Sequence, residues 1–181
     1  SGLLVLLVGP ATRLSEYLST LPKKYEARAR LGVSTDTHDA EGTTMKVHDS
    51  GVEPTREQIE AELATFAGRG QQVPPQFSAK KVGGERMYKK ARRGDIVQLP
   101  PVDVEIFEIR MTDYAPPEIG FTMTCSSGTY VRAVARDLGD RLGVGAHLTA
   151  LRRTAVGAFS VDCAVSGDAL REGLAPDPAH W

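Results

Sequence analysis

Apolar and polar residues alternate over residues 24–31, where Tyr25, Ala27, Ala29 and Leu31 are separated by charged side chains. A period of two is typical of a strand with one buried face. The sequence therefore predicts a strand here, with Tyr25 pointing inward. Other apolar runs bounded by turn residues predict further strands at residues 3–8, 43–47, 77–80, 102–111, 119–125, 148–153 and 158–161.

Apolar residues recur at helical spacing in several other segments. The clearest is residues 129–142, for which Thr129 is the predicted N-cap and Gly143 the stop. Further helices are predicted at residues 11–21, 54–66, 85–93 and 168–172, whereas 34–42 and most of 68–84 read as loops. This order of elements predicts a mixed α/β (α+β) fold, with a largely antiparallel sheet and flanking helices.

The composition is that of an ordinary globular protein. The 181 residues are 41% hydrophobic and 25% charged, which fits one domain. Cys125 and Cys163 are the two cysteines and have no paired spacing, so neither a disulfide framework nor a cysteine zinc site is expected, and a cytoplasmic location is the default. The apolar run 3–8 is too short to span a membrane.

Positive charge is concentrated in one segment. Residues 76–93 contain seven basic residues and one acidic residue, a net charge of +6, whereas the rest of the chain has 15 basic and 22 acidic residues. A chain with this asymmetry does not coat polyanions generally, so any contact with a polyanion should be local.

Sequence signatures of common nucleotide and metal chemistry do not occur. The chain lacks the GxxxxGK[ST], GxSxG and HExxH patterns. His38, Asp39 and Glu41 have the types of side chain that ligate metals, but in loops such residues more often satisfy backbone donors. No metal site is predicted.

Several stretches, in order and over nearly the whole chain, resemble the TruB family of tRNA pseudouridine synthases. They include SGLLVLLVGPATRL, KKYEARARLG, STDTHDAEG, QQVPPQFSAKKVGGERMYKKARRG and CSSGTYVRAVARDLGDRLGVGAHLTALRRTAVGAF. The resemblance implies a pseudouridine synthase catalytic domain that isomerises a uridine in the T loop of tRNA, at position 55. It also implies no cofactor, a tRNA T arm as partner, no protein partner, and a monomer.

The resemblance assigns catalytic roles to two residues. Tyr25 matches the family tyrosine that stacks on the uracil and is the expected general base. Arg132 matches the arginine that pairs with the catalytic aspartate. Without the resemblance, Tyr25 is more simply read as a core tyrosine, and Arg132 as a surface arginine.

Other family positions suggest contacts with the flipped uridine. Tyr130 and Leu151 match residues that line its pocket, although both types are common in cores. Asp39 matches a loop residue near the nucleotide and is equally well read as a turn-capping aspartate. Lys80 matches a phosphate or pocket contact.

The basic segment, at about residues 76–99, resembles the family's thumb-like insertion over the T arm. Its concentrated charge favours phosphate binding over the alternative of a solvated helix face. The predicted contacts with the RNA backbone are Lys81, Arg86, Lys89, Lys90, Arg92 and Arg93, with Arg152 and Arg153 extending them.

The chain departs from the family pattern at its start. The motif GTLDPxASG supplies the nucleophilic aspartate four residues before a serine that corresponds to Ser1, so the aspartate is absent from these residues. We expect residues 1–181 to be a single catalytic domain that lacks its N-terminal part, with no RNA-binding module of the PUA type recognisable before Trp181. Two alternatives follow: part of an enzyme that is inactive alone, or a module that only binds RNA.

Overall fold

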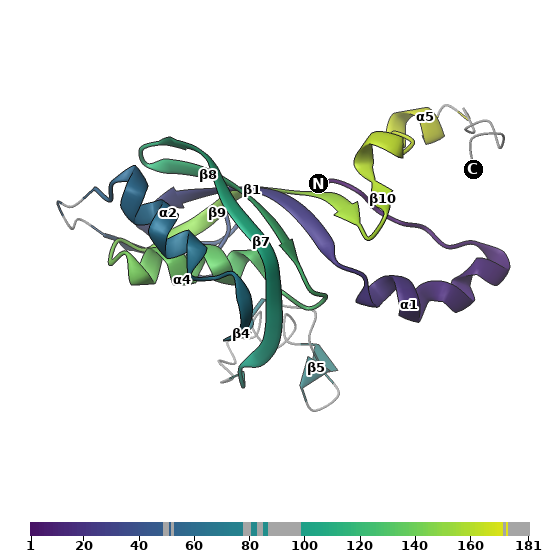
Figure 1. Cartoon of the computed structure of the whole chain (residues 1–181), viewed down its shortest axis with the longest axis horizontal. Coiled ribbons are helices and arrows are strands. Elements are labelled where there is room, and N and C mark those ends of the chain that lie inside the picture. The colour runs from purple at the N-terminus through teal and green to yellow at the C-terminus, as the bar shows by residue number, and fades with distance from the viewer. Residues whose placement is uncertain are drawn as a thin grey trace.

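The computed structural model describes residues 1–48, 51, 53–77, 81–82, 85–86, 99–171 and 173; for residues 81–82 and 85–86 it describes the backbone only. A six-stranded sheet forms the body of the molecule, in the order β10-β9-β1-β8-β7-β4 (Figure 1). Its strands are β1 Lys23–Leu31, β4 Gly68–Gln72, β7 Val102–Ala115, β8 Glu118–Cys125, β9 Ala146–Val156 and β10 Phe159–Ser160. Every neighbouring pair is antiparallel, which confirms the predicted mixed fold with a largely antiparallel sheet.

Two short hairpins lie outside the main sheet. One pairs β2 Val33–Thr35 with β3 Thr44–Val47, and the other pairs β5 Lys81–Val82 with β6 Glu85–Arg86. The first brackets the loop at residues 36–43, which carries Asp39.

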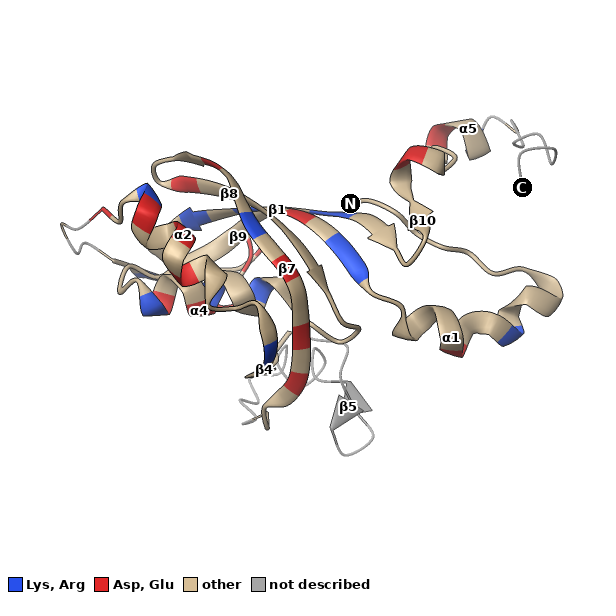
Figure 2. Cartoon of the chain, in the orientation of Figure 1, with Lys and Arg blue, Asp and Glu red and all other residues tan. Residues whose placement is uncertain are grey.

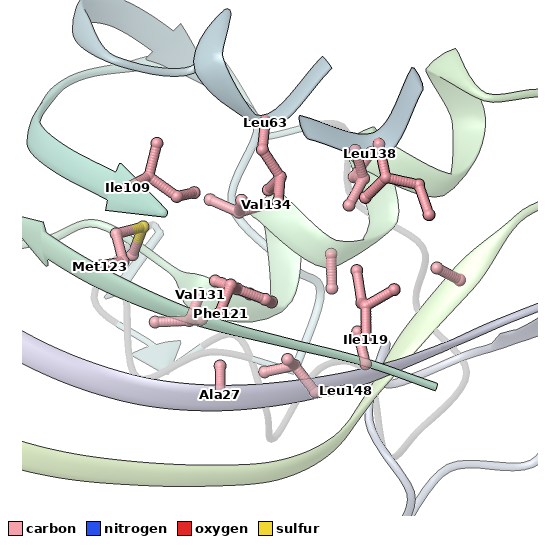
Figure 3. Packing of buried hydrophobic residues seen from close by; sticks show 14 of the residues in the cluster. Ala27, Leu63, Ile109, Ile119, Phe121, Met123, Val131, Val134, Leu138 and Leu148 are labelled. Carbon is pink, nitrogen blue, oxygen red and sulfur yellow. The ribbon is translucent and has the colours of Figure 1, made fainter. Parts of the chain in front are cut away.

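Two helices, α2 Arg56–Ala64 and α4 Val131–Arg141, cover one face of the sheet, while α1 Ser15–Thr20 and α5 Gly167–Arg171 lie away from its body (Figure 1). The remaining described helices are η1 Gly9–Leu14 and η2 Val161–Cys163. The apolar faces of α2 and α4 meet the sheet in a shared core, shown in Figure 3, which labels Leu63, Val134 and Leu138 from the helices beside strand residues such as Phe121 and Leu148. Thr55 caps the start of α2: its hydroxyl accepts the Gln58 amide, and the Gln58 side chain accepts the Thr55 amide.

The alternation along β1 fixes which side of the strand is buried. Ala27, Ala29 and Leu31 are buried and Tyr25 packs against the same core, while the charged residues between them are exposed. The inward direction predicted for Tyr25 is therefore confirmed.

The predicted strand at residues 3–8 is wrong. Gly2 makes a single parallel bridge to Arg153, after which the chain leaves the sheet, and Leu4, Leu6 and Val8 are 68%, 68% and 81% exposed. β10 pairs with β9 at Ala155 and Val156, so the edge of β9 beyond Arg153 is already occupied.

The predictions for residues 68–93 also need correction. Gly68–Gln72 is not a loop but the edge strand β4, because pairing with β7 stabilises an extended chain despite the glycines. Glu85–Arg86 is a strand rather than the start of a helix, and Phe77 lies in a bend. The rest of the predicted strand 77–80 and helix 85–93 lies outside the described residues.

The start of α4 differs from the prediction by one residue. Tyr130, not Thr129, occupies the N-cap position, and no side chain caps the helix there. The Thr129 hydroxyl instead contacts the Ser126 hydroxyl at 3.2 Å.

Candidate active site

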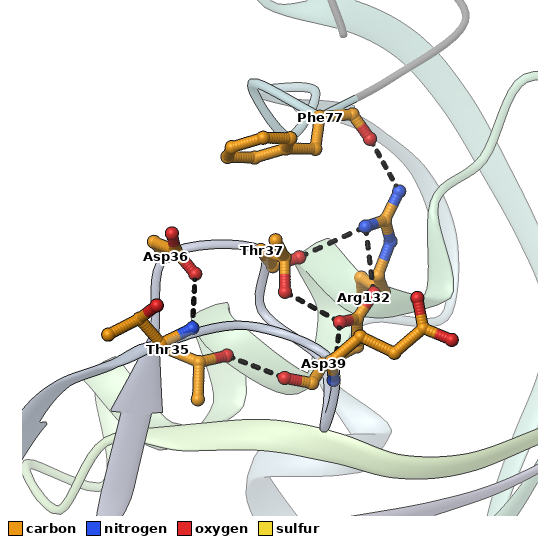
Figure 4. A network of polar contacts seen from close by, with 8 residues as sticks. Thr35, Asp36, Thr37, Asp39, Phe77 and Arg132 are labelled. Atoms are coloured by element: carbon orange, nitrogen blue, oxygen red, sulfur yellow. Dashed lines mark hydrogen bonds and ion pairs between the residues drawn. The ribbon is translucent and has the colours of Figure 1, made fainter. Parts of the chain in front are cut away.

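Arg132, in the first turn of α4, is held by three acceptors (Figure 4). Its Nη1 donates to the Thr37 carbonyl at 3.1 Å and to Asp39 Oδ2 at 2.9 Å, and its Nη2 donates to the Phe77 carbonyl at 2.6 Å. The side chain is 23% exposed. The alternative reading of Arg132 as a surface arginine is therefore wrong.

The loop that carries Asp39 is braced by its own side chains. Asp39 Oδ1 accepts the Thr37 hydroxyl at 2.6 Å and the Glu41 amide at 3.1 Å, so Asp39 caps a turn with one oxygen and binds Arg132 with the other. His38 has a φ of 60°, and its carbonyl accepts the Leu148 amide of β9 at 3.0 Å. The loop is thus fixed both to β9 and to α4.

Tyr130 is anchored by Gln72, a residue that no sequence motif pointed to. The Gln72 side chain accepts the Tyr130 amide at 2.8 Å and donates to the Tyr130 carbonyl at 3.1 Å. Gln72 is only 5% exposed. In the sequence, Gln72 stands out only by its place in QQVPP, shortly before two prolines. That pattern does not predict a contact with Tyr130.

Tyr25 lies on β1 between Met123 of β8 and Arg153 of β9. Burial raises the pKa of its hydroxyl above the usual value, and the Cys125 thiol adds to this rise. Arg153 opposes it, through its charge and a hydrogen bond to the hydroxyl. Arg153 is thus the neighbour that favours the ionised form of Tyr25.

Leu151 and Arg153 lie on the same face of β9 as Tyr25 does on β1. Leu151 is opposite Ala27 and packs against the core, and its carbonyl accepts the Ser1 ammonium at 3.1 Å. Arg153 Nε donates to the Leu3 carbonyl at 2.9 Å. The first residues of the chain therefore lie beside the strand that flanks Tyr25.

Arg152 and Arg153 lie on opposite faces of the sheet. Successive residues of a strand point to opposite faces, and Arg152 is exposed on the face opposite Tyr25 while Arg153 is half-buried beside it. Of the two, Arg152 is the one exposed to solvent, and their contact with RNA stays a prediction.

The geometry gathers several predicted residues on the helix-covered side of the sheet. Tyr25 and Leu151 face that side, and Arg132 and Tyr130 lie at the N-terminal end of α4, which packs on β1 and β9. Lys80, Lys89, Lys90, Arg92 and Arg93 lie outside the described residues, as do the side chains of Lys81 and Arg86.

Charge differs between the strands on either side of β8. β1 carries four basic residues and one acidic residue, whereas β7 carries four acidic residues and one basic residue. Figure 2 colours these positions blue and red along the two strands. In the described part of the chain, no group of three or more His, Cys, Asp or Glu residues could hold a metal ion. Within those same residues, no helix is long and apolar enough to cross a membrane.

Solved structures share this arrangement of strands and helices. A Cbf5-Nop10-Gar1 complex superposes with a TM-score of 0.60 at 24% identity, covering 83% of this chain and 35% of that one. An H/ACA RNP bound to a substrate RNA containing 2'-deoxyuridine gives a TM-score of 0.55 at 21% identity, over 83% and 33% of the two chains. The fold is that of the pseudouridine synthases.

Sequence comparison identifies the family within this fold. The family described as "TruB family pseudouridylate synthase (N terminal domain)" matches residues 1–131, and the "tRNA pseudouridylate synthase B C-terminal domain" matches residues 132–176. The chain belongs to the TruB family. The boundary between the two matches falls within α4, and β9, which follows it, pairs with β1, which precedes it.

Curated relatives carry the name "tRNA pseudouridine synthase B". The protein of Opitutus terrae is 44% identical over 94% of this chain and 70% of its own length. Those of Xanthomonas campestris and Burkholderia pseudomallei are 44% and 46% identical over 94% of this chain, and 55% and 56% of their own lengths. The chain thus spans between 55% and 70% of these relatives.

Proposed function

We propose that residues 1–181 form most of the catalytic domain of an enzyme that isomerises the T-loop uridine of tRNA, position 55, to pseudouridine. Family membership and the name of the relatives support the activity. The observation that carries it in the structure is the position of Tyr25 and Leu151 on the sheet face beneath α4, whose first turn holds Arg132. The proposed substrate implies a cytoplasmic location.

The reaction needs the uracil to leave the base stack and rest on an aromatic platform. Tyr25 supplies the ring, and Leu151 with Tyr130 supplies apolar surface nearby. The glycosidic C–N bond breaks, the base turns over, and a C–C bond forms to the same ribose. No oxidation occurs, so the chemistry requires no redox cofactor.

A carboxylate nucleophile is also required, and we assign it to an aspartate four residues before Ser1. The Ser1 nitrogen lies 3.1 Å from the Leu151 carbonyl, so a preceding segment would start beside β9, the strand that pairs with β1 at Tyr25. Four extended residues reach at most about 14 Å. Such an aspartate would lie within this reach of Ser1.

Arg132 retains the capacity to bind that carboxylate. Its contacts with Thr37, Asp39 and Phe77 use three of the five N–H groups of a guanidinium. Among the described residues, Nε–H and the second Nη2–H have no protein acceptor. These two N–H groups can donate to the oxygens of a carboxylate while Asp39 keeps the guanidinium in place.

Proton removal from carbon 5 falls to Tyr25. A neutral phenol is a weak base, so the ionised form must become accessible during the reaction. Arg153 supports ionisation through its charge and hydrogen bond, against the effect of burial. Tyr25 therefore acts as a platform and as the proposed general base.

Most basic side chains of β1, and Arg152, face away from Tyr25, so they would attract tRNA phosphates outside the flipped nucleotide. Phosphates are repelled by β7, with its four acidic residues, and attracted by β1 and by Arg152. The basic segment 76–99 adds the strongest concentration of positive charge.

The test compares residues 1–181 with a longer protein that includes the upstream coding region. Conversion of uridine is measured in a T-arm stem-loop RNA, and both proteins are assayed for RNA binding. We expect conversion by the longer protein and none above background by residues 1–181. If purified residues 1–181 convert uridine, and Arg132→Ala abolishes this conversion, another carboxylate must act as the nucleophile. Binding without conversion by the longer protein would instead support the RNA-binding module.

A further inference from the structure

The amide side chain of Gln72 is buried against the backbone of Tyr130. It makes two hydrogen bonds, one to the Tyr130 N–H at 2.8 Å and one to the Tyr130 carbonyl at 3.1 Å, and it is 5% exposed. Gln72 ends β4 while Tyr130 begins α4, so the contact spans 58 residues of sequence. Two bonds from one planar amide fix both the position and the orientation of the Tyr130 backbone.

The residues that follow Gln72 are tied to the same helix. Arg136 Nη2 donates to the Val73 carbonyl at 3.1 Å, and Arg132 Nη2 donates to the Phe77 carbonyl at 2.6 Å. Pro74 and Pro75, between these contacts, are fully buried. The segment 72–77 therefore lies along the first two turns of α4 and contacts it at three points.

The start of α4 depends on this contact because it has no side-chain cap of its own. Tyr130 occupies the N-cap position, where Ser, Thr, Asp or Asn would normally stabilise the first turn. Gln72 stabilises that residue from outside the helix. Arg132 is only two residues further along, so an error in the Tyr130 backbone displaces the guanidinium.

We propose that Gln72 is a positioning residue for the reaction: by fixing the Tyr130 backbone it sets where Arg132 presents its free donors. The proposal rests on the proposed function, since it assigns Arg132 to the reacting centre. Gln72 itself lies behind the helix start and is not expected to touch RNA. Its loss should lower the rate of the chemical step and leave RNA affinity nearly unchanged.

The variant that tests the proposal is Gln72→Met in the full-length protein, because methionine matches glutamine in size and removes both hydrogen bonds. The matched control is Gln71→Met, on the same strand, where the side chain is exposed and contacts Asp103 at 3.2 Å. We expect the single-turnover rate of Gln72→Met at saturating T-arm RNA to fall roughly 10- to 100-fold, the usual effect of an ångström-scale displacement. Its Kd for RNA should stay within about threefold, and Gln71→Met should match the unmutated protein.

Two further measurements separate positioning from a general structural role. Amide exchange at Tyr130 should accelerate in Gln72→Met, whatever the activity, because its acceptor is gone. When Arg132 is already replaced by Lys, adding Gln72→Met should lower the single-turnover rate by less than about threefold. The effect shrinks because Gln72 acts on the rate by positioning Arg132. If the first variant is insoluble, Gln72→Asn, which shortens the amide by one methylene, should show the same pattern.

Specific outcomes would overturn the proposal. The first is that Gln72→Met reacts at the parental rate although amide exchange at Tyr130 is faster. The second is that Gln72→Met lowers the rate by the same factor whether residue 132 is Arg or Lys. If the unmutated protein converts no uridine, the proposed function is wrong, and so is the role of Gln72 in it. If the unmutated protein is active and Gln72→Met reacts equally fast, only the role of Gln72 is wrong.

Discussion

Arg132 and Asp39 form an ion pair of 2.9 Å between Nη1 and Oδ2, although 93 residues separate them in sequence (Figure 4). Both side chains are mostly buried, at 23% and 26% exposed. The pair connects the loop after β2 to the first turn of α4. Asp39 can therefore affect the reaction through Arg132 without being the nucleophile.

Asp39→Asn in the full-length protein should slow the chemical step roughly 10- to 100-fold. Asparagine keeps an oxygen for Thr37 and the Glu41 amide, but it loses the charge that holds Arg132. Leaving the guanidinium without its partly buried partner should also lower the free energy of unfolding by about 1–3 kcal/mol. Single-turnover rates and denaturant unfolding would measure the two effects.

Asp36→Asn is the matched control for this prediction. Asp36 lies in the same loop, and its Oδ1 accepts the Thr43 amide at 2.8 Å without contacting Arg132. The rate of this variant should stay near that of the parent. Equal losses of rate for Asp36→Asn and Asp39→Asn would show that the loop, and not the ion pair, matters.

The strands and helices with strong periodicity were predictable from the sequence. The alternation from Tyr25 to Leu31 defined β1 and its buried face, and the spacing from Val131 to Leu138 defined α4. Both patterns arise because each element buries one side, so burial is encoded locally. The family motifs then singled out Tyr25 and Arg132, which residue type alone could not.

The errors fall where structure depends on distant partners. Gly68–Gln72 forms a strand because it pairs with the free edge of β7. Residues 3–8 form no strand, because β10 already pairs with the edge of β9 there. Contacts of Gln72 with Tyr130, and of Asp39 with Arg132, join elements far apart in sequence. No local pattern encodes such pairs.

Stability should fall at alkaline pH because of Cys125. Burial raises the pKa of this thiol from 9.0 to about 11. The folded state then holds the proton more tightly than the unfolded state, so the stabilisation is complete below pH 9 and is lost as pH rises to about 11. Since a tenfold change in proton affinity corresponds to about 1.4 kcal/mol, the loss by pH 11 should reach roughly 2–3 kcal/mol.

Cys125→Ala should flatten this decline, although the variant is less stable at neutral pH because it leaves a small cavity. Tyr25, whose pKa is also raised, should leave some residual slope. Cys163→Ala is the control, because Cys163 is exposed and its removal should leave the pH profile unchanged. Urea unfolding between pH 8 and 11 gives the comparison; the same slope in Cys125→Ala and the parent would contradict the assignment.

The basic segment should carry much of the affinity for tRNA, a prediction from sequence alone. Each lysine or arginine that contacts phosphate steepens the dependence of log affinity on log salt by roughly one. Replacing Lys89, Lys90, Arg92 and Arg93 by alanine should therefore weaken binding and flatten that slope. Arg153→Ala should leave the slope unchanged, since Arg153 contacts Tyr25 and Leu3. If the variant with all four replacements keeps the parental affinity and the parental salt dependence, the segment is a solvated surface that does not bind phosphate.

Tyr25 is assigned two separable roles in the full-length protein, stacking on the flipped uracil and taking the proton from carbon 5. Tyr25→Phe keeps the ring packed against the core and removes only the hydroxyl that Arg153 contacts. RNA affinity should stay within a few fold, while the chemical step slows by roughly two to four orders of magnitude, the usual contribution of a positioned acid or base. Tyr25→Leu should weaken RNA binding as well, since stacking of a base on an aromatic ring contributes about 1–3 kcal/mol.

The decisive measurement for Tyr25 is the single-turnover rate at saturating RNA, which separates chemistry from binding and product release. Tyr17→Phe provides a matched control, because it removes the same hydroxyl from a tyrosine that is 65% exposed on α1. The rate of this control should equal that of the parent. If Tyr25→Phe also reacts at the parental rate, the hydroxyl is not the base, and Tyr25 serves only as a platform or a core residue. If instead both the rate and the affinity fall together in Tyr25→Phe, the hydroxyl contributes to binding the uridine, and the general base must be sought among the other groups on the same face of the sheet.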